Sequence, residues 1–294
     1  MKDTAASHKD LDGRAVAASI LEACKTYFAA HDRVGRLVSI SIGDAASVAV
    51  YVRNQARAAT KAGLPFDQHL WCKDISQVEA KAQIQKMNDD PSVLGIILQR
   101  PLPEHLNIRS LQSAIHPLKD IEGMNPASIG NIVYSDVALA PCTAAASVEL
   151  LKQTGLQLEG LEVVMIGHSE IVGKPAAMML MAEGATVTVC HHMTRSVAMH
   201  ARAADAVVVA VGIPEFLGPD MIKPGAAVID IGINQITSPD GKTRIVGDVD
   251  TDAVREIAGW ITPVPGGVGP VTVAILMRNA TVAHQRQIIA GWME

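Results

Sequence analysis

Tyr51 and Gln55 are the first pair in this sequence whose types and spacing could take part in chemistry. They belong to the stretch SVAVYVRNQARAATKAG, residues 47–63, which we predict to be a helix that ends at its glycine. Positions i and i+4 share one helix face, so the phenol and the amide would face the same partner. Spacing alone favours a simpler interpretation, in which the tyrosine covers part of the core and the glutamine is solvated.

A glycine turn within residues 161–184 is the second chemical pattern. The apolar run LEVVMIG ends at Gly167, a short turn leads to Gly173, and a helix is predicted beyond Pro175. In the fingerprint G-x-G-x-x-G, the glycines allow a tight turn and let backbone N–H groups approach a pyrophosphate at a helix N-terminus. Here the spacing is one residue longer, and Ser169 takes the place of the middle glycine. The pattern indicates a nucleotide site, although a purely structural turn between a strand and a helix has the same form.

The end of the following strand bears on which dinucleotide would bind. An NAD site has a carboxylate there for the ribose 2′-hydroxyl, whereas this chain has CHHMTRS, with His191, His192 and Arg195. A basic cluster suits a 2′-phosphate, so the sequence favours NADP over NAD. The alternative is a solvated, histidine-rich loop.

Neither a metal site nor a disulfide framework is indicated by the spacing of the possible ligands. No His, Cys or carboxylate cluster has metal-ligand spacing, so we expect no metal. The cysteines lie far apart and form no CxxC pair, which suits reduced thiols; they are Cys24, Cys72, Cys142 and Cys190.

Composition narrows the class of protein. Hydrophobic residues make up 49% of the chain and charged residues 19%, which describes a globular protein, and only 3% aromatics implies an aliphatic core. A net charge of −5 argues against a general binder of nucleic acid or anionic membrane. The start MKDTAASHKD has no features of a targeting peptide, and no apolar run has membrane-spanning length, so we expect a cytoplasmic location.

Short apolar runs alternate with helical patterns along the chain. This alternation predicts βαβ units and parallel sheets, which is an α/β fold. The predicted strands are 35–43, 70–72, 93–99, 161–167, 186–190, 205–212 and 226–233, the helices include 76–90, 176–184 and 270–287, and 122–131 is predicted to be a loop.

Several motifs together resemble one family, the bifunctional methylenetetrahydrofolate dehydrogenase/methenyltetrahydrofolate cyclohydrolases. They occur in order over nearly the whole chain, and ITPVPGGVGP is the most specific; the others include LDGRAVAASI, GDAASVAVYV, GIILQRPLP, HPLKDIEGMNP, PCT, VIDIGIN and VGDVD. The resemblance implies two α/β lobes with a cleft between them. A folate-binding, catalytic domain would span 1–142 with the C-terminal helix 270–294 packing back on it, and a Rossmann-type NAD(P)-binding domain would span 143–269. Members of this family are usually homodimers.

The family's two reactions place different demands on a protein. Hydride moves from the methylene bridge between N5 and N10 of tetrahydrofolate to the nicotinamide, which requires chiefly alignment and electrostatics. The resulting methenyl cation then adds water to give 10-formyltetrahydrofolate, which requires a titratable group tuned near neutrality.

The chain departs from the family's pattern on the folate side. Tyr51, which the family uses to stack with and orient the folate, is kept, but Gln55 stands where the family has its proton-handling lysine. Glu122 replaces an aspartate that contacts the pterin, Val48 replaces a serine, and Arg100 replaces a leucine or methionine. Since glutamine has no proton to exchange, we expect cyclohydrolase activity to be absent or very weak.

We therefore expect an NADP-dependent methylenetetrahydrofolate dehydrogenase. The alternatives are an oxidoreductase of the same fold that acts on a different folate or an iminium-type substrate, a non-catalytic protein that binds folate and NADP, and a full bifunctional enzyme.

The resemblance assigns site residues at three levels. The expected catalytic positions are Tyr51, Gln55, Gln99 and Glu122. The expected substrate contacts are Val48, Tyr51, Leu98, Gln99, Arg100, Pro101, Glu122, Pro265, Gly266 and Gly267. The expected cofactor contacts are Thr143, Gly167, His168, Ser169, Ile171, Val172, His191, His192, Arg195, Val211, Gly212, Ile213, Ile233, Gly269 and Thr272. We expect Asp230 and Asp248, which follow or flank strands, to cap turns.

Overall fold

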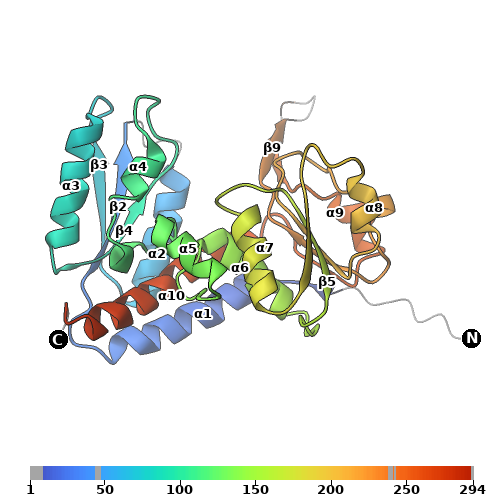
Figure 1. The fold of residues 1–294 in the computed structure, drawn as a ribbon, viewed down its shortest axis with the longest axis horizontal. Coiled ribbons are helices and arrows are strands. Elements are labelled where there is room, and N and C mark those ends of the chain that lie inside the picture. Colours follow the sequence, from blue (N-terminus) through green and yellow to red (C-terminus); the bar gives the residue numbers. More distant parts are fainter. Residues whose placement is uncertain (1–8, 44–47, 238–240, 242, 293–294) are drawn as a thin grey trace, which may run out of the picture. The chain divides into compact units, whose positions relative to one another are not determined.

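The computed structural model describes residues 9–43, 48–237, 241 and 243–292. Its contacts divide the chain into two compact units, each built from distant stretches of sequence (Figure 1). We call residues 18–142 with 273–294 the first unit, and the residues up to Ala17 with 143–272 the second unit. The segment before Ala18, assigned from the sequence to the folate-binding domain, contacts the second unit, because β1 (Lys9–Asp10) pairs in parallel with β11 (Trp260–Ile261).

The first unit contains a parallel three-stranded sheet in the order β3-β2-β4. Its strands are β2 (Arg36–Ile42), β3 (Phe66–Trp71) and β4 (Val93–Leu98), and the connecting helices are α2 (Ala49–Ala62) and α3 (Gln77–Asp89). The helices cover opposite faces of the sheet (Figure 1). Alternate residues of β2 point to opposite faces, so Leu37 packs with the alanines of α2 whereas Val38 and Ile40 pack with α3. The predicted helix at 47–63 is confirmed over its described residues, and Gly63 ends it at φ 79°.

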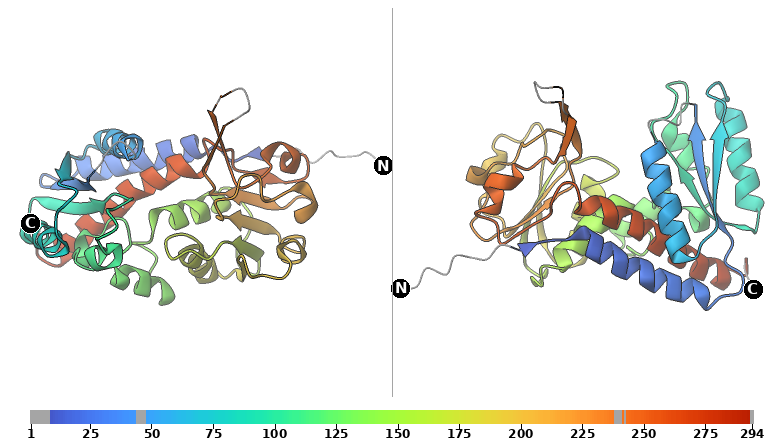
Figure 2. Two further views of the ribbon diagram at one scale, coloured as in Figure 1. Left: turned by 90° about the horizontal axis from the view of Figure 1, so that it is seen from above. Right: turned by 180° about the vertical axis from the view of Figure 1, so that it is seen from behind.

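The last helix packs against the first unit, as expected. Four residues of α10 (Val268–Ile289) enter a core with the end of α1 (Gly13–Ala29), and the two helices run side by side there (Figure 2). Those residues are Leu276, Met277, Ala280 and Ala283. The Asn279 amide donates to the carbonyls of Ile121 and Ala140 at 2.9 and 3.0 Å. Because buried polar groups need partners, these amide–carbonyl bonds fix the position of the helix, in addition to the packing of its apolar residues.

The predicted loop at 122–131 is wrong in its second half, where α5 (Pro126–Val133) forms. Asn125 is its N-cap and accepts a bond from the Ala127 N–H, and Pro126 occupies the first turn, where a missing N–H costs nothing. Asparagine and proline were therefore helix-start residues here rather than loop residues. Two further short elements, α4 (Ile108–Gln112) and a 3₁₀ turn (Pro117–Lys119), precede α5, and α6 (Cys142–Lys152) follows it.

The second unit is built on a parallel six-stranded sheet in the order β1-β11-β8-β7-β5-β6. Its central strands are β5 (Glu162–Ile166), β6 (Thr186–Cys190), β7 (Ala206–Val209) and β8 (Ala227–Asp230), and its helices include α7 (Gly173–Ala182), α8 (Val197–Ala201) and α9 (Thr251–Arg255). From β5 the chain adds β6 on one side of the sheet and then β7 and β8 on the other side, so the direction in which strands are added reverses between β5 and β7. In open α/β sheets, the crevice at the carboxyl ends of such strands is where ligands bind. This is the Rossmann-type arrangement expected from the sequence.

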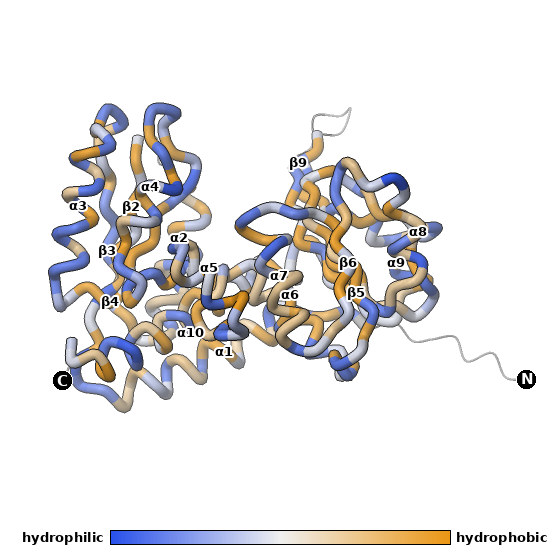
Figure 3. The backbone as a smooth tube through the Cα atoms, viewed as in Figure 1, coloured by the Kyte–Doolittle hydropathy of each residue, from blue (hydrophilic) through white to orange (hydrophobic). Residues whose placement is uncertain are grey.

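The core is aliphatic, as composition predicted. Every residue of β7 and β8 is buried, and Figure 3 shows the apolar segments gathered along the strands. A short antiparallel pair, β9 (Asn234–Thr237) with β10 (Thr243–Val246), was not predicted. Most of its residues are exposed, so the pair lacks the apolar run that marks the other strands. Within the described residues, no helix combines the length and apolar character that spanning a membrane requires.

Candidate functional site

Gln55 and Gln99 are joined in one hydrogen-bonded network with Ser39. The Gln99 side-chain amide donates to Gln55 Oε1 at 2.6 Å and to Ser39 Oγ at 3.0 Å, so both of its N–H bonds are used. Gln99 follows β4 and its backbone N–H donates to the Ile40 carbonyl of β2, which anchors the side chain at the sheet. Gln99 is buried and Gln55 is half-buried. The position where the resemblance has a lysine is therefore filled by a neutral, hydrogen-bonded amide.

The two serines of β2 were not predicted from the sequence to belong to this site. Ser39 and Ser41 alternate with Val38, Ile40 and Ile42, so they lie on the sheet face that α2 covers, and both are fully buried. Ser41 Oγ has no hydrogen-bond partner among the described residues. The sign was present in VSISI, because hydroxyls at alternate positions of a buried strand need partners on one face.

Glu122 is the titratable group of this region. Its Oε2 accepts a bond from the Leu98 N–H at 2.8 Å, one residue before Gln99. Burial raises the pKa of the Glu122 carboxyl to about 7, and the Asp120 charge adds to that rise, whereas the Leu98 N–H bond and the Arg100 charge oppose it. A carboxyl whose pKa is raised toward neutrality therefore binds the backbone one residue before Gln99.

The remaining expected substrate contacts differ in their accessibility. Tyr51 is 54% exposed, and Arg100 and Pro101 are exposed as well. In contrast, Val48 and Leu98 are 4% and 1% exposed, so their side chains belong to the core.

Pro265, Gly266 and Gly267 belong to the second unit, unlike the other expected folate contacts. Gly266 has φ 122°, a conformation open to glycine, and a Cβ at Gly267 would lie 2.7 Å from the Pro263 carbonyl. Gly13 of α1 packs directly against this turn, because a Cβ there would lie 1.8 Å from the Gly267 carbonyl. The motif glycines are thus required by backbone packing in this turn.

The glycine turn after β5 is equally close-packed. Gly167 has φ 116°, and a Cβ on it would lie 2.2 Å from the Ala210 carbonyl at the end of β7. A Cβ on Gly173 would lie 2.1 Å from the Gly167 carbonyl. Ser169 Oγ accepts from the Gly173 N–H at 3.4 Å, which closes the turn onto the start of α7. The backbone that would face a pyrophosphate is therefore held in one conformation at the switch point of the sheet.

Two buried aspartates organise the neighbouring loops. Asp248 Oδ2 accepts from the N–H groups of Val211 and Gly212 at 2.7 and 2.9 Å, which fixes the loop after β7. Asp230 accepts from the N–H groups of Gly232, Asp248 and Val249, and burial raises the pKa of its carboxyl to about 6. Asp230 caps its own turn through the Gly232 N–H, as expected, whereas Asp248 holds a loop distant in sequence instead of capping a local turn.

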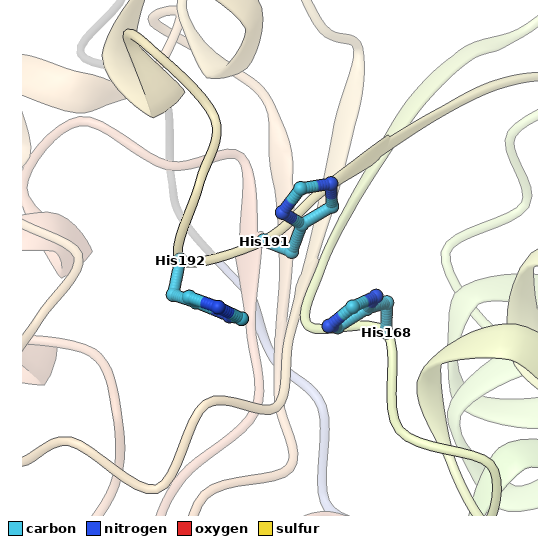
Figure 4. A group of neighbouring side chains, drawn as sticks. All are labelled: His168, His191 and His192. Carbon is cyan, nitrogen blue, oxygen red and sulfur yellow. The ribbon is translucent and has the colours of Figure 1, made fainter.

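Three histidines come together beside the glycine turn (Figure 4). The ring centroids of His168 and His191 are 4.6 Å apart, and each lies 5.8 Å from that of His192. One ligating nitrogen from each ring lies within 4.8 Å of the other two. The spacing of these histidines along the chain carried no sign of this cluster, because parallel pairing of β5 and β6 unites residues 23 and 24 positions apart. The expectation that the protein binds no metal stays a prediction.

Local contacts affect the pKa of His168 and the tautomer of His191. Desolvation by its neighbours, then the charges of His191, His192 and Lys174, lower the pKa of the exposed His168. His191 Nδ1 accepts from the Met193 N–H at 3.1 Å, which leaves the proton of the neutral ring on Nε2. Arg195 is exposed on the same loop.

All the other expected cofactor contacts also belong to the second unit. Ile171, Ile213 and Ile233 follow β5, β7 and β8 and are 39%, 51% and 55% exposed, which places apolar side chains at the carboxyl edge of the sheet. Val172 immediately precedes α7, Thr143 lies in the first turn of α6, and Gly269 and Thr272 lie in the first turns of α10.

Comparison with known proteins matches both parts of the chain. Residues 11–122 match the catalytic domain of the tetrahydrofolate dehydrogenase/cyclohydrolase family, and residues 141–288 match its NAD(P)-binding domain. A relative from Roseobacter denitrificans, bifunctional protein FolD 3, is 76% identical over 282 residues, which are 96% of this chain and 97% of the relative. Bifunctional protein FolD of Rhodobacter capsulatus is 69% identical over 290 residues, 98% and 97% of the two chains.

Solved structures give the same result. Bifunctional FolD of Campylobacter jejuni has a TM-score of 0.90 at 37% identity and covers 95% of this chain and 99% of its own. The methylenetetrahydrofolate dehydrogenase-cyclohydrolase of Trypanosoma brucei, solved with NADP and an inhibitor, has a TM-score of 0.89 at 35% identity and covers 96% and 98%.

Proposed function

Because this chain belongs to the tetrahydrofolate dehydrogenase/cyclohydrolase family, we propose that it oxidises 5,10-methylenetetrahydrofolate to 5,10-methenyltetrahydrofolate with NADP and hydrolyses the product very weakly or not at all. The observation that carries this proposal is the Gln99–Gln55 hydrogen bond of 2.6 Å. This bond holds the Gln55 amide at the position of the family's lysine, and an amide does not act as an acid or base near neutral pH.

The dehydrogenase part rests on positioning. Methylenetetrahydrofolate supplies the hydride, and NADP, when bound, supplies the acceptor. The rigid turn at Gly167 and Gly173 and the loop fixed by Asp248 would orient the dinucleotide, while Tyr51 would orient the folate. No protein group has to exchange a proton in this step, so the loss of a lysine affects it less than it affects hydrolysis.

The preference for NADP rests on the second unit. The loop after β6 offers imidazole N–H groups and an arginine where an NAD site would have a carboxylate. His168, from the adjacent turn, adds a third ring to this cluster. The relative from Trypanosoma brucei that was solved with NADP supports the same choice of cofactor.

Weak hydrolysis follows from the chemistry of water addition. Loss of a positioned general acid or base typically costs about 10²–10⁴ in rate. Arg53 and Arg57 are exposed, and an arginine stays protonated, so neither replaces the lysine as a base.

Glu122 favours a second candidate, the full bifunctional enzyme. With a pKa of about 7, its carboxyl exists in both protonation states at neutral pH and could move the protons that water addition requires. The names of the bifunctional relatives also support this candidate. A different folate or iminium-type substrate remains the third candidate, supported by the exposed Arg100. Cytoplasmic location and a homodimer are further parts of the proposal that follow from the family.

Two assays on the purified protein separate these candidates. NADPH absorbance is followed with methylenetetrahydrofolate and NADP, and loss of methenyltetrahydrofolate absorbance is followed against the spontaneous rate. We expect NADPH formation with hydrolysis near the spontaneous rate. Hydrolysis far above that rate in the wild type, lost in Glu122→Gln, would select the bifunctional enzyme. No NADPH from either the wild type or Tyr51→Phe would refute the dehydrogenase.

A further inference from the structure

The His168, His191 and His192 cluster has a geometry that dinucleotide binding does not by itself require. Two of its rings follow β6 directly and the third comes from the turn after β5, so the paired strands fix the distance between their backbones. In Figure 4 the three rings surround one space. No carboxylate belongs to this group, so imidazole nitrogens are its potential ligands.

The nitrogens lie within 4.8 Å of one another, so side-chain rotation, including a turn of the His168 ring out of its stack on His191, must bring them closer to share one ion. With metal–nitrogen bonds of about 2.0–2.1 Å, the ligands of a tetrahedral ion lie about 3.3 Å apart. Here the ligating atoms lie within 4.8 Å of one another, and His168 and His192 are exposed, so rotation of their side chains can close the remaining distance. Imidazole suits zinc, copper, nickel and iron, and three histidines leave a fourth position for water.

We propose that His168, His191 and His192 bind one divalent transition-metal ion, and that this ion and NADP exclude each other. The second clause rests on the proposed function, because it takes the same histidines as the neighbours of the 2′-phosphate. The ion is an alternative occupant of the site and is not required for hydride transfer.

Two local features oppose metal binding, and each has only a small effect. The Met193 N–H bond to His191 Nδ1 must be given up, but Met193 is 76% exposed, so water can replace the imidazole as the acceptor. The Lys174 charge lies near His168, but both side chains are exposed and solvent screens their interaction with an ion.

Metal binding is tested on tag-free protein by calorimetric titration with Zn²⁺ in the absence of NADP and folate. Co²⁺ then provides a visible absorption spectrum that reports coordination by nitrogen. We expect one ion per chain and an affinity at least 10-fold lower in His168→Asn/His192→Asn. His69→Asn, in β3 of the first unit, is the matched control and should bind as the wild type does. Thermal melting checks that each variant is folded.

Absence of binding to the wild type, or equal binding to the double variant, would overturn the metal site. Competition is tested separately by titrating NADP with and without saturating Zn²⁺, and we expect at least a 10-fold loss of NADP affinity. Unchanged NADP affinity at a saturated site would overturn the exclusion. Failure of the proposed function gives a different result, because metal-free protein would then form no NADPH while Zn²⁺ binding persisted.

Discussion

Replacement of Gln55 by lysine is the most direct test of how this site is divided between the two reactions. We expect Gln55→Lys to raise the rate of methenyltetrahydrofolate hydrolysis, because it introduces an exchangeable proton at the position where glutamine offers none. The magnitude expected for one restored general acid or base is about 10²–10⁴. The dehydrogenase rate should change much less, since hydride transfer depends on alignment.

The surrounding network can offer the lysine an acceptor if the Gln99 amide turns over. At present the Gln99 N–H₂ group faces both Gln55 Oε1 and Ser39 Oγ. A lysine ammonium can only donate, so the Gln99 amide must rotate by half a turn and present its carbonyl oxygen. The Ser39 hydroxyl both donates and accepts, so it can then donate to the same oxygen. The serine found at this buried position therefore makes the exchange possible.

Gln55→Met is the matched control, because it keeps a long side chain and has no proton to exchange. The assay follows methenyltetrahydrofolate absorbance for wild type, both variants and buffer alone. Equal hydrolysis by Gln55→Lys and Gln55→Met, with both proteins folded and active as dehydrogenases, would refute the assignment of the lost step to residue 55. A large rate in the wild type would refute it as well, and would direct attention to Glu122.

Three further outcomes are expected. The pKa of the Glu122 carboxyl is about 7 in the folded protein and about 4.5 when unfolded, so the folded state holds its proton more tightly. Stability should therefore fall as pH rises from about 4.5 to 7, by up to about 3 kcal/mol, and Glu122→Gln should reduce this dependence in denaturant titrations. Gly173→Ala should destabilise the protein by about 1–3 kcal/mol and weaken NADP binding, because its Cβ would lie 2.1 Å from the Gly167 carbonyl. Gly130→Ala in α5 is the control: its Cβ would meet open space, so NADP binding should not change and stability should stay the same or improve. Asp248→Ala should raise the KM for NADP, since the Val211 and Gly212 N–H groups lose their acceptor; an unchanged KM would contradict that role.

Strands β4, β7 and β8 could be predicted from sequence because they are buried on both faces. β4 and β7 are continuous runs without a polar side chain, and β8 is apolar up to Asp230; such runs between helical patterns have few other interpretations. The short helix α5 could not be predicted from composition alone, because Asn125 and Pro126 favour both a turn and a helix start. The choice between them depends on Asp120, whose carboxylate accepts from the Asn125 N–H and from the Ser128 hydroxyl.

The local conformation of candidate site residues was predictable where it depends on the backbone, and less so where it depends on proximity in space. Gly167 and Gly173 are fixed by contacts with nearby backbone, and their spacing carries that information. Nothing in the spacing of His168 and His191 indicates that their rings stack at 4.6 Å, because their proximity comes from the parallel pairing of two strands joined by a helix.

Gln55, Gln99 and Ser39 share one set of hydrogen bonds, so replacing any one of them affects the others. Both N–H bonds of the Gln99 side chain are satisfied, one of them by a buried serine. Glu122 accepts from the Leu98 N–H, one residue from the same network. Because buried polar groups are costly unless paired, these residues form one interdependent set. Ser39→Ala should therefore lower stability more in the wild type than in Gln99→Leu, where the hydroxyl has already lost its donor, and additive losses in the two variants would show that the groups act independently.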